Sequence, residues 1–410
     1  MHRKNILLFA LGISFLFIMF VYAAHVITPT AINYNEGVSR IYNITVNNSD
    51  ATQPGNITQV NVTIPSSFTF ATNTNATSAT SVVVFTNTST VLSWTNVTDG
   101  LVSNLSLQYF WFNATASTPG TFNISVYTTN VTGTYNTNIT VTINDTTAPS
   151  SIVFQGTTPS DGSNLSQTSI PVNISVTDNG NVGTIRIYLF NSTRTLINNT
   201  NTTTNNGLVN FTGLTDGTYY VNATANDTAG NQNLTGTGTI TINLDTTNPL
   251  ISIGTGTQND GVNLSVTAIY INVSVTETNE RNITFVLYNA TSSVNQTVFT
   301  DSTRFINWTG LPNGNYTYNV SIRDYANNVN TTTTRTITID TTAPSVSLSC
   351  SPATVYSNDL ITCTCGASDS IDSVLSVSFT QNPSTLNTGS YTTSCTSTDD
   401  SGNTGSSSFG

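Results

Sequence analysis

Few side chains in this sequence are able to carry out catalysis. A serine or cysteine nucleophile needs an imidazole base beside it, but the 410 residues contain only His2 and His25. The single lysine is Lys4, and no cysteine precedes Cys350. Residues 30–340 therefore lack the parts of a Ser-His-Asp triad, a Cys-His pair or a catalytic zinc site, which usually draws on His or Cys. We expect no enzymatic activity.

Paired carboxylates are the remaining candidates for acid-base chemistry. Glu277 and Glu280 lie three positions apart, and two carboxyl groups facing one cleft would suit glycoside hydrolysis. A solvated turn explains the pair better, and we favour that explanation.

Aspartates recur in predicted turns, where their oxygen atoms suit calcium. Capping of the turns by aspartate explains the same pattern without a metal. We expect no cofactor on this basis and keep calcium as the weaker alternative. The calcium candidates are Asp145, Asp245 and Asp340 in repeated pentapeptides, and Asp227, Asp324 and Asp399 in predicted hairpins.

All four cysteines lie near the carboxyl end of the chain: Cys350, Cys363, Cys365 and Cys395. In an exported chain they are expected to form disulfides. Four cysteines permit three pairings. Cys350 ends one predicted strand, while Cys363 and Cys365 share a face of the next, so we favour Cys350–Cys363 and Cys365–Cys395. Zinc is the lesser alternative, because C-x-C is poor spacing for its ligands.

One predicted strand carries aromatic rings on both faces, at residues 109–112. Phe110 and Phe112 would face the core, whereas Tyr109 and Trp111 would face outward. The outward pair suits stacking on a sugar or a partner protein. A covering loop or a neighbouring domain also explains it, and we favour that explanation.

Asn-x-Ser/Thr sequons occur 31 times between Asn43 and Thr332. They predict N-glycosylation in a host that has the transferase, although an alternating strand of Asn, an apolar residue and Thr yields sequons by itself. The last segment, from residue 345 on, alternates in the same way and has none, which favours glycosylation at several sites. The candidates are Asn61, Asn123, Asn173, Asn222, Asn272 and Asn319.

The chain begins with a targeting signal. Arg3 and Lys4 precede an apolar run at residues 6–21, and Ala23 and Ala24 then offer a signal-peptidase site. Residues 1–24 are predicted to be a signal peptide or, alternatively, an uncleaved anchor helix of bilayer-spanning length. In both cases the rest is exported.

Pentapeptides of the form Asp-Thr-Thr-x-Pro recur at residues 145–149, 245–249 and 340–344. A fixed period indicates one structural unit repeated. Because proline cannot donate to a strand ladder, each pentapeptide is predicted to be a short, stiff junction. The predicted domains are 25–145, 150–245, 250–340 and 345–410, and we expect the last to lack part of its closing strand.

A second repeat supports β-sandwich units. Leu-x-x-Gly-x-Tyr, followed by Asp and Asn at fixed distances, begins at Leu214, Leu311 and Leu386. It resembles the tyrosine corner of an immunoglobulin-like sandwich. Apolar residues alternate with polar ones, as at 172–177 and 271–276, which is typical of half-buried strands. Beyond the leader no helical periodicity is evident, so the fold is predicted to be all-β.

The linkers and the G-x-Y to D-x-x-G-N endings resemble bacterial and archaeal Ig-like surface repeats. The last domain is similar to a hyalin-repeat domain through residues 349–352 and 397–403. This resemblance implies a tandem array of Ig-like β-sandwiches. The first domain departs from the pattern around Phe122, and its residues 60–70 resemble repeats of other prokaryotic envelope proteins.

These features predict a non-catalytic protein, secreted or on the cell surface, that serves as a stalk or envelope component. One alternative is an adhesin that binds glycan or protein through the first domain, and another is an accessory region of a secreted hydrolase. The expected partners are the cell envelope and neighbouring surface proteins or glycans. The membrane is expected to take part only through an anchor at either end. A net charge of −11 argues against nucleic acid, which requires a basic patch.

Overall fold

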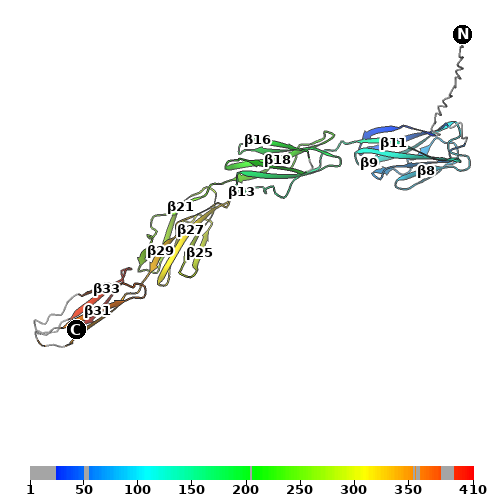
Figure 1. Cartoon of the computed structure of the whole chain (residues 1–410). Coiled ribbons are helices and arrows are strands. Elements are labelled where there is room, and N and C mark those ends of the chain that lie inside the picture. The colour runs from blue at the N-terminus through cyan, green and yellow to red at the C-terminus, as the bar shows by residue number, and fades with distance from the viewer. Residues whose placement is uncertain (1–24, 50–54, 204–205, 354–355, 357–360, 380–391) are drawn as a thin grey trace, which may run out of the picture.

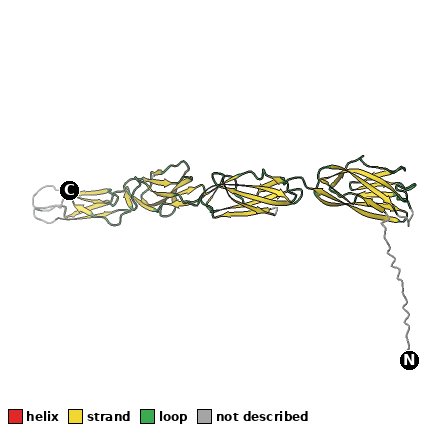
Figure 2. Cartoon of the chain, turned by 90° about the horizontal axis from the view of Figure 1, so that it is seen from above, coloured by secondary structure: helices red, strands yellow, loops and turns green. Residues whose placement is uncertain are grey.

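The computed structural model describes residues 25–410 except 50–54, 204–205, 354–355, 357–360 and 380–391. The predicted leader, residues 1–24, lies outside the described residues. Every regular element in the described part is a β-strand, which confirms the predicted fold class. No helix in that part has the length and apolar character needed to cross a membrane. The strands form four modules arranged end to end (Figures 1 and 2).

Module 1 (residues 25–144) is a sandwich of two sheets. Its strands are β1 (His25–Thr28), β2 (Ala31–Asn35), β3 (Ser39–Asn48), β4 (Gln59–Thr63), β5 (Phe68–Phe70), β6 (Ala76–Thr77), β7 (Val84–Asn87), β8 (Val91–Thr95), β9 (Ser106–Ala116), β10 (Gly120–Asn130) and β11 (Gly133–Asn144). One sheet has the order β1-β3-β9-β5, with β6 also on β9, and the other has the order β2-β11-β10-β4-β8-β7. Module 1 therefore has more strands than the modules that follow it.

Modules 2 (151–244) and 3 (250–339) share one topology. Module 2 contains β12 (Ser151–Phe154), β13 (Ser163–Leu165), β14 (Ser169–Thr177), β15 (Val182–Phe190), β16 (Leu196–Thr202), β17 (Asn206–Thr212), β18 (Gly217–Asp227), β19 (Gln232–Asn233) and β20 (Ile240–Leu244). Module 3 contains β21 (Leu250–Ile253), β22 (Val262–Leu264), β23 (Ile269–Thr276), β24 (Glu280–Tyr288), β25 (Ser293–Phe299), β26 (Phe305–Trp308), β27 (Gly314–Asp324), β28 (Val329–Thr331) and β29 (Arg335–Ile339).

In both modules a three-stranded sheet, β12-β14-β17 or β21-β23-β26, faces a larger one, β13-β20-β18-β15-β16 or β22-β29-β27-β24-β25. The short strands β13 and β22 run parallel to the last long strands, β20 and β29. In each of these two modules the second strand therefore pairs with the last one.

Module 4 (345–409) is smaller in its described part. It contains β30 (Ser345–Ser351), β31 (Thr362–Ser368), β32 (Val377–Phe379), β33 (Thr393–Thr398) and β34 (Thr404–Phe409). These strands form a pair, β30-β31, and a three-stranded sheet, β32-β33-β34.

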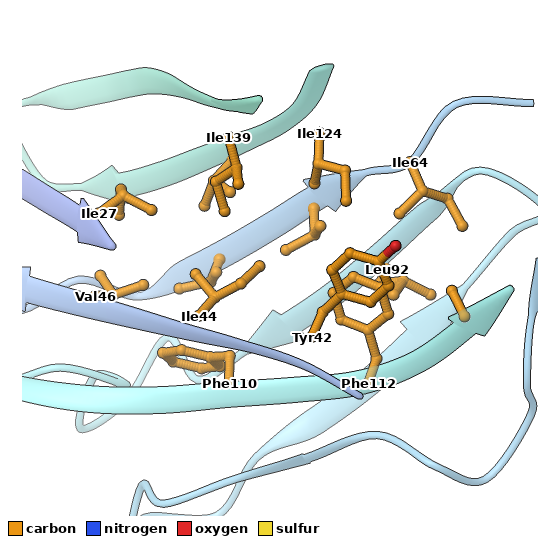
Figure 3. Close-up of a cluster of buried hydrophobic side chains, with 14 of the residues drawn as sticks. Ile27, Tyr42, Ile44, Val46, Ile64, Leu92, Phe110, Phe112, Ile124 and Ile139 are labelled. Atoms are coloured by element: carbon orange, nitrogen blue, oxygen red, sulfur yellow. The ribbon is translucent and has the colours of Figure 1, made fainter. Parts of the chain in front are cut away.

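Period-two alternation places the core between the two sheets of each module. Val172, Ile174 and Val176 of β14 are 0%, 0% and 4% exposed, and the polar residues between them face outward. In module 1 the side chains of Tyr42, Ile44 and Val46 on β3 turn toward the opposite sheet (Figure 3).

The Leu-x-x-Gly-x-Tyr repeat forms a tyrosine corner in modules 2 and 3. The Tyr219 hydroxyl donates to the Thr215 carbonyl at 2.9 Å, and the Tyr316 hydroxyl donates to the Pro312 carbonyl at 2.8 Å. The strand that carries the tyrosine, β18 or β27, starts two residues earlier, at Gly217 or Gly314. Both glycines have a φ of about 150°, a value that only glycine adopts readily. In the third copy Tyr391 lies outside the described residues.

Candidate functional site at the module junctions

Three five-residue junctions connect the modules: the first junction (145–149), the second (245–249) and the third (340–344). Each starts with an aspartate whose Oδ1 accepts the backbone N–H of the second threonine, at 3.1 Å from Asp145, Asp245 and Asp340 alike. An aspartate side chain that bonds to its own backbone two residues on favours a defined turn. The repeated pentapeptide therefore has a fixed local shape.

An asparagine of the following module holds the carbonyl of each junction aspartate. The Nδ2 to carbonyl distances are 3.3 Å for Asn231 on Asp145, 2.8 Å for Asn328 on Asp245 and 2.7 Å for Asn403 on Asp340. The junction therefore belongs structurally to the module that follows it.

The same asparagines are oriented by the hairpin aspartates of the repeat. The two oxygens of Asp227 accept the backbone N–H and the Nδ2 of Asn231 at 2.8 and 2.7 Å. Asp324 and Asp399 do the same for Asn328 and Asn403. Turn capping by these aspartates is thus part of the junction itself.

Side chains of the preceding module hold the junction threonines. Glu36 Oε1 accepts the Thr146 N–H at 3.0 Å and the Thr147 hydroxyl at 2.6 Å. Asp216 and Asn313 act in the same way at the second and third junctions. Partial burial works against ionisation of Glu36, but the hydrogen bonds from Thr147 and Thr146 outweigh it and lower the pKa of Glu36.

The modules also contact each other directly. Asn179 of module 2 donates through Nδ2 to Glu36 of module 1, and Ser166 of module 2 donates to Asn328 of module 3. Each junction is therefore bonded on both sides rather than being a free linker.

Two junctions also gather carboxylates. One oxygen from each of Asp145, Asp178 and Asp227 lies within 4.8 Å of the other two, and the same is true of Asp340, Asp369 and Asp399. We call these the first and third acidic triads. Of the predicted calcium candidates, Asp245 and Asp324 belong to no such group among the described residues.

Asp178 and Asp369 were missed by the sequence analysis. Both follow a strand directly, β14 and β31, and only the sandwich topology brings them beside the junction. Their common place after an alternating strand was the available signal. Asp216 and Asn313 were missed as well, although each precedes the glycine of the Leu-x-x-Gly-x-Tyr repeat.

The two acid-base candidates, Glu277 and Glu280, are engaged in structural contacts. Glu280 forms an ion pair with Arg304, and Glu277 Oε1 accepts the Asn279 N–H at 2.7 Å. His25, the histidine within the described residues, is buried and bonded to the Thr128 hydroxyl.

The aromatic strand β9 presents Tyr109 and Trp111 on the outer face of module 1. Tyr109 remains 41% exposed, and Trp111 is partly buried between Asn43 on β3 and Ala76 on β6. Strand β6 extends the sheet beside β9. The outward rings therefore lie next to an added edge strand.

Among the candidate glycosylation sites, Asn123 is exposed and the others are half-buried. The Oδ1 atoms of Asn61 and Asn222 are buried without a hydrogen-bond partner among the described residues. Glycosylation of these sites stays a prediction.

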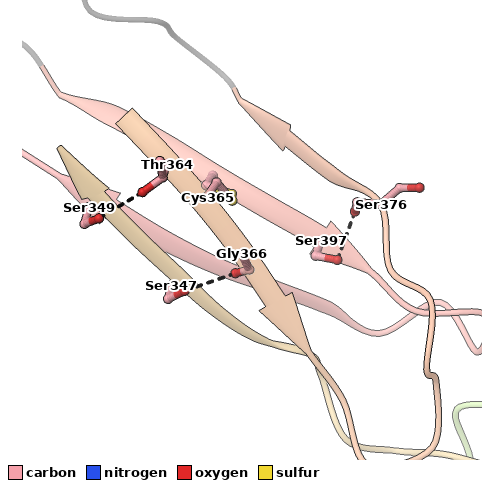
Figure 4. The surroundings of a disulfide bond; sticks show 8 residues. Ser347, Ser349, Thr364, Cys365, Gly366, Ser376 and Ser397 are labelled. Carbon is pink, nitrogen blue, oxygen red and sulfur yellow. Dashed lines mark hydrogen bonds between the residues drawn. A yellow bond between two sulfur atoms is a disulfide. The ribbon is translucent and has the colours of Figure 1, made fainter. Parts of the chain in front are cut away.

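The structure pairs Cys350 with Cys363 and Cys365 with Cys395. The first disulfide joins directly opposite residues of β30 and β31, and the second connects β31 to β33 across the two sheets. Hydrogen bonds such as Ser349–Thr364 and Ser376–Ser397 surround it (Figure 4). Cys365–Cys395 therefore links the two layers of module 4, whereas Cys350–Cys363 staples one of them.

Residues 301–375 match the family model described as "Bacterial Ig-like domain (group 3)". The match covers the part of module 3 from β26 on and continues into module 4. No curated protein sequence matches the chain. The chain is a tandem array of Ig-like modules, whereas the likeness of module 4 to a hyalin repeat stays a prediction.

Several solved structures are similar in fold. An ectodomain fragment of ICAM-5 is 12% identical with a TM-score of 0.42, covering 94% of this chain and 97% of that one. A tetra-tandem repeat from the extending region of a large adhesion protein is 13% identical with a TM-score of 0.30, covering 93% and 99%. The fibronectin(III)-like modules of Clostridium thermocellum CbhA are 14% identical with a TM-score of 0.30, covering 46% and 93%.

Proposed function

We propose that this chain is an exported, non-catalytic spacer, a stalk whose Ig-like modules keep its two ends apart. The observation that supports it most is the repetition of one hydrogen-bonded lock at all three junctions. An asparagine of the following module holds each junction from one side, and Glu36, Asp216 or Asn313 holds it from the other. Flexible spacers instead use Gly/Ser-rich linkers without such contacts.

The scarcity of reactive groups supports a passive role. The carboxylates that would serve as acid and base are held in an ion pair and a turn, and the described histidine is buried. The predicted leader and the two disulfides support a place outside the cytoplasm, where disulfides persist.

Small-angle X-ray scattering of residues 25–410 is expected to show a rod. Strands of about ten residues rise about 3.3 Å per residue, so four modules in line reach about 140 Å. The radius of gyration of such a rod is about 40 Å, whereas a globule of this length would have about 21 Å. A measured value near the globular one would contradict the stalk.

Substitution of a junction clamp tests the lock itself. Asp216→Ala removes the acceptor for Thr246 and Thr247. It is expected to reduce the radius of gyration of the chain, because the second junction can then bend. Asp301→Ala is the matched control, because the bond that Asp301 accepts among the described residues, from the Thr303 N–H, stays within its own turn. Equal scattering curves for the two variants would count against the lock.

The outer face of module 1 favours a second candidate function, adhesion through an aromatic patch. Tyr109 and Trp111 lie on one face of β9 among neutral polar residues, a combination that suits stacking on sugar rings. Binding of the whole exported chain to a glycan array is expected to fall about tenfold or more in Tyr109→Ala and Trp111→Ala. Tyr325→Ala, which removes a tyrosine 56% exposed on module 3, should leave binding unchanged. Equal binding by all three variants would contradict adhesion through this patch.

A further inference from the structure

Two of the three junctions gather carboxylates without a basic side chain to balance them. Module 4 contains no lysine, arginine or histidine. The ion pair found in the described part of the chain, Arg304–Glu280, lies in module 3. Like charges this close repel each other, most strongly where water is partly excluded. Among the described residues, neither triad therefore has a positively charged partner.

The third acidic triad contains a buried oxygen without a donor. Asp340 is 0% exposed. Its Oδ1 accepts from Asn313 Nδ2 at 2.9 Å and from the Thr342 N–H at 3.1 Å, whereas its Oδ2 has no hydrogen-bond partner among the described residues. In the first triad Asp178 Oδ1 also lacks a hydrogen-bond partner among the described residues, on a side chain that is half-buried. A buried oxygen in this state is costly unless a ligand completes its coordination.

The electrostatic environment of Asp340 also disfavours a buried carboxylate that has no cation beside it. Burial raises the pKa of the Asp340 carboxyl, and the charges of Asp369, Asp399 and Asp372 raise it further. At the first junction burial likewise raises the pKa of Asp145, with a contribution from Asp227. A bound cation would remove this repulsion.

The spacing of the oxygens suits calcium. Ca²⁺ holds oxygen ligands at about 2.3 to 2.6 Å, so two ligands of one ion lie at most about 5 Å apart. The triad oxygens lie within 4.8 Å of one another. A donor set made only of oxygen selects a hard cation, and water or backbone carbonyls complete the shell of Ca²⁺.

The second junction avoids the repulsion among three close carboxylates without a cation. Its loop, residues 277–279, is one residue shorter than the loop 178–181 of module 2. Glu277 stands where Asp178 does, and both carboxylates accept a backbone N–H of their own loop. At the second junction, however, Asn279 Nδ2 donates to Asp245 Oδ2 at 3.2 Å. A neutral amide donor therefore replaces the third carboxylate. At the first junction the loop places Gly180 against Asp145 Oδ2, where even a Cβ would overlap that oxygen.

We propose that the first and third junctions each bind one Ca²⁺, through the first and third acidic triads, and that the second junction binds none. Bound calcium ties the loop after β14 in module 2 to the first junction, and the loop after β31 in module 4 to the third junction. That bound calcium stiffens the chain at these two junctions rests on the proposed stalk function, whereas calcium binding itself does not.

Calorimetric titration of the chelator-treated chain, residues 25–410, with CaCl₂ up to about 5 mM tests the proposal. Two sites are expected. Asp178→Asn should weaken calcium binding at the first junction at least about tenfold, and Asp369→Asn should do the same at the third junction. Calcium should also raise the melting transitions of modules 2 and 4 and leave that of module 3 unchanged.

Glu277→Gln is the matched control and should retain both sites. If Asp369→Asn fails to fold, Asp369→Glu tests the same site with its charge kept. This variant introduces the longer side chain that Glu277 has at the second junction. Absence of binding heat, or two sites retained in Asp178→Asn and Asp369→Asn, would overturn the proposal. Loss of a site in Glu277→Gln would overturn the assignment of the second junction. Scattering of the same samples separates a failure of calcium binding from a failure of the stalk.

Discussion

Replacement of both Cys365 and Cys395 by serine is expected to unfold module 4 and to leave modules 1–3 folded. Cys395 is the one apolar side chain that is fully buried in the described part of module 4, so this module has little core. The disulfide closes a loop with a sequence separation of 30, and its loss removes about 3 to 4 kcal/mol of stability by the loop-entropy relation. That is comparable with the whole stability of a small domain.

Limited proteolysis followed by mass spectrometry measures this effect. The serine variant should be cut down to a stable fragment that ends near the third junction, and the unsubstituted chain should do the same only under reducing conditions. Substitution of Cys350 and Cys363, whose separation is 13, should cost about 3 kcal/mol and act more weakly. Unchanged resistance of module 4 after loss of Cys365–Cys395 would show that packing alone holds it.

Trp94→Ala is expected to unfold module 1 selectively. Trp94 is 1% exposed and lies between Phe85 and Phe110, with ring centroids 5.0 and 5.5 Å away. Removal of a buried tryptophan leaves a large cavity and costs about 3 to 5 kcal/mol. Calorimetry should show one transition shifted to low temperature, with those of the other modules unaffected.

Trp111→Ala is the matched control for this prediction. It removes the same side chain from the outer face of the same module, where Trp111 is only partly buried, so its cost should be clearly smaller. Equal destabilisation by the two variants would mean that the outer ring contributes to stability as much as the core does.

The fold follows from the sequence wherever one local rule decides. Alternation at residues 172–177 was enough to place Val172, Ile174 and Val176 in the core. The glycine of Leu-x-x-Gly-x-Tyr marks the corner because backbone geometry excludes other residues there. These features depend on contacts within a few residues.

The candidate site is predicted less completely because it is assembled from distant segments. Asp145, Asp178 and Asp227 are separated by tens of residues and meet only when two sheets pack. Glu36 lies more than a hundred positions from the threonines that it holds. Strand alternation predicts which face a residue occupies, but it does not predict which end of the sandwich a loop reaches.

In modules 2 and 3 the parallel pairing of the second strand with the last strand has a mechanical consequence. Strands β13 and β20 run side by side in the same direction, as do β22 and β29. A pull on the two ends of the chain therefore slides one strand along the other and loads their hydrogen bonds together instead of peeling them apart one by one. Modules 2 and 3 are accordingly expected to resist tension applied along the chain.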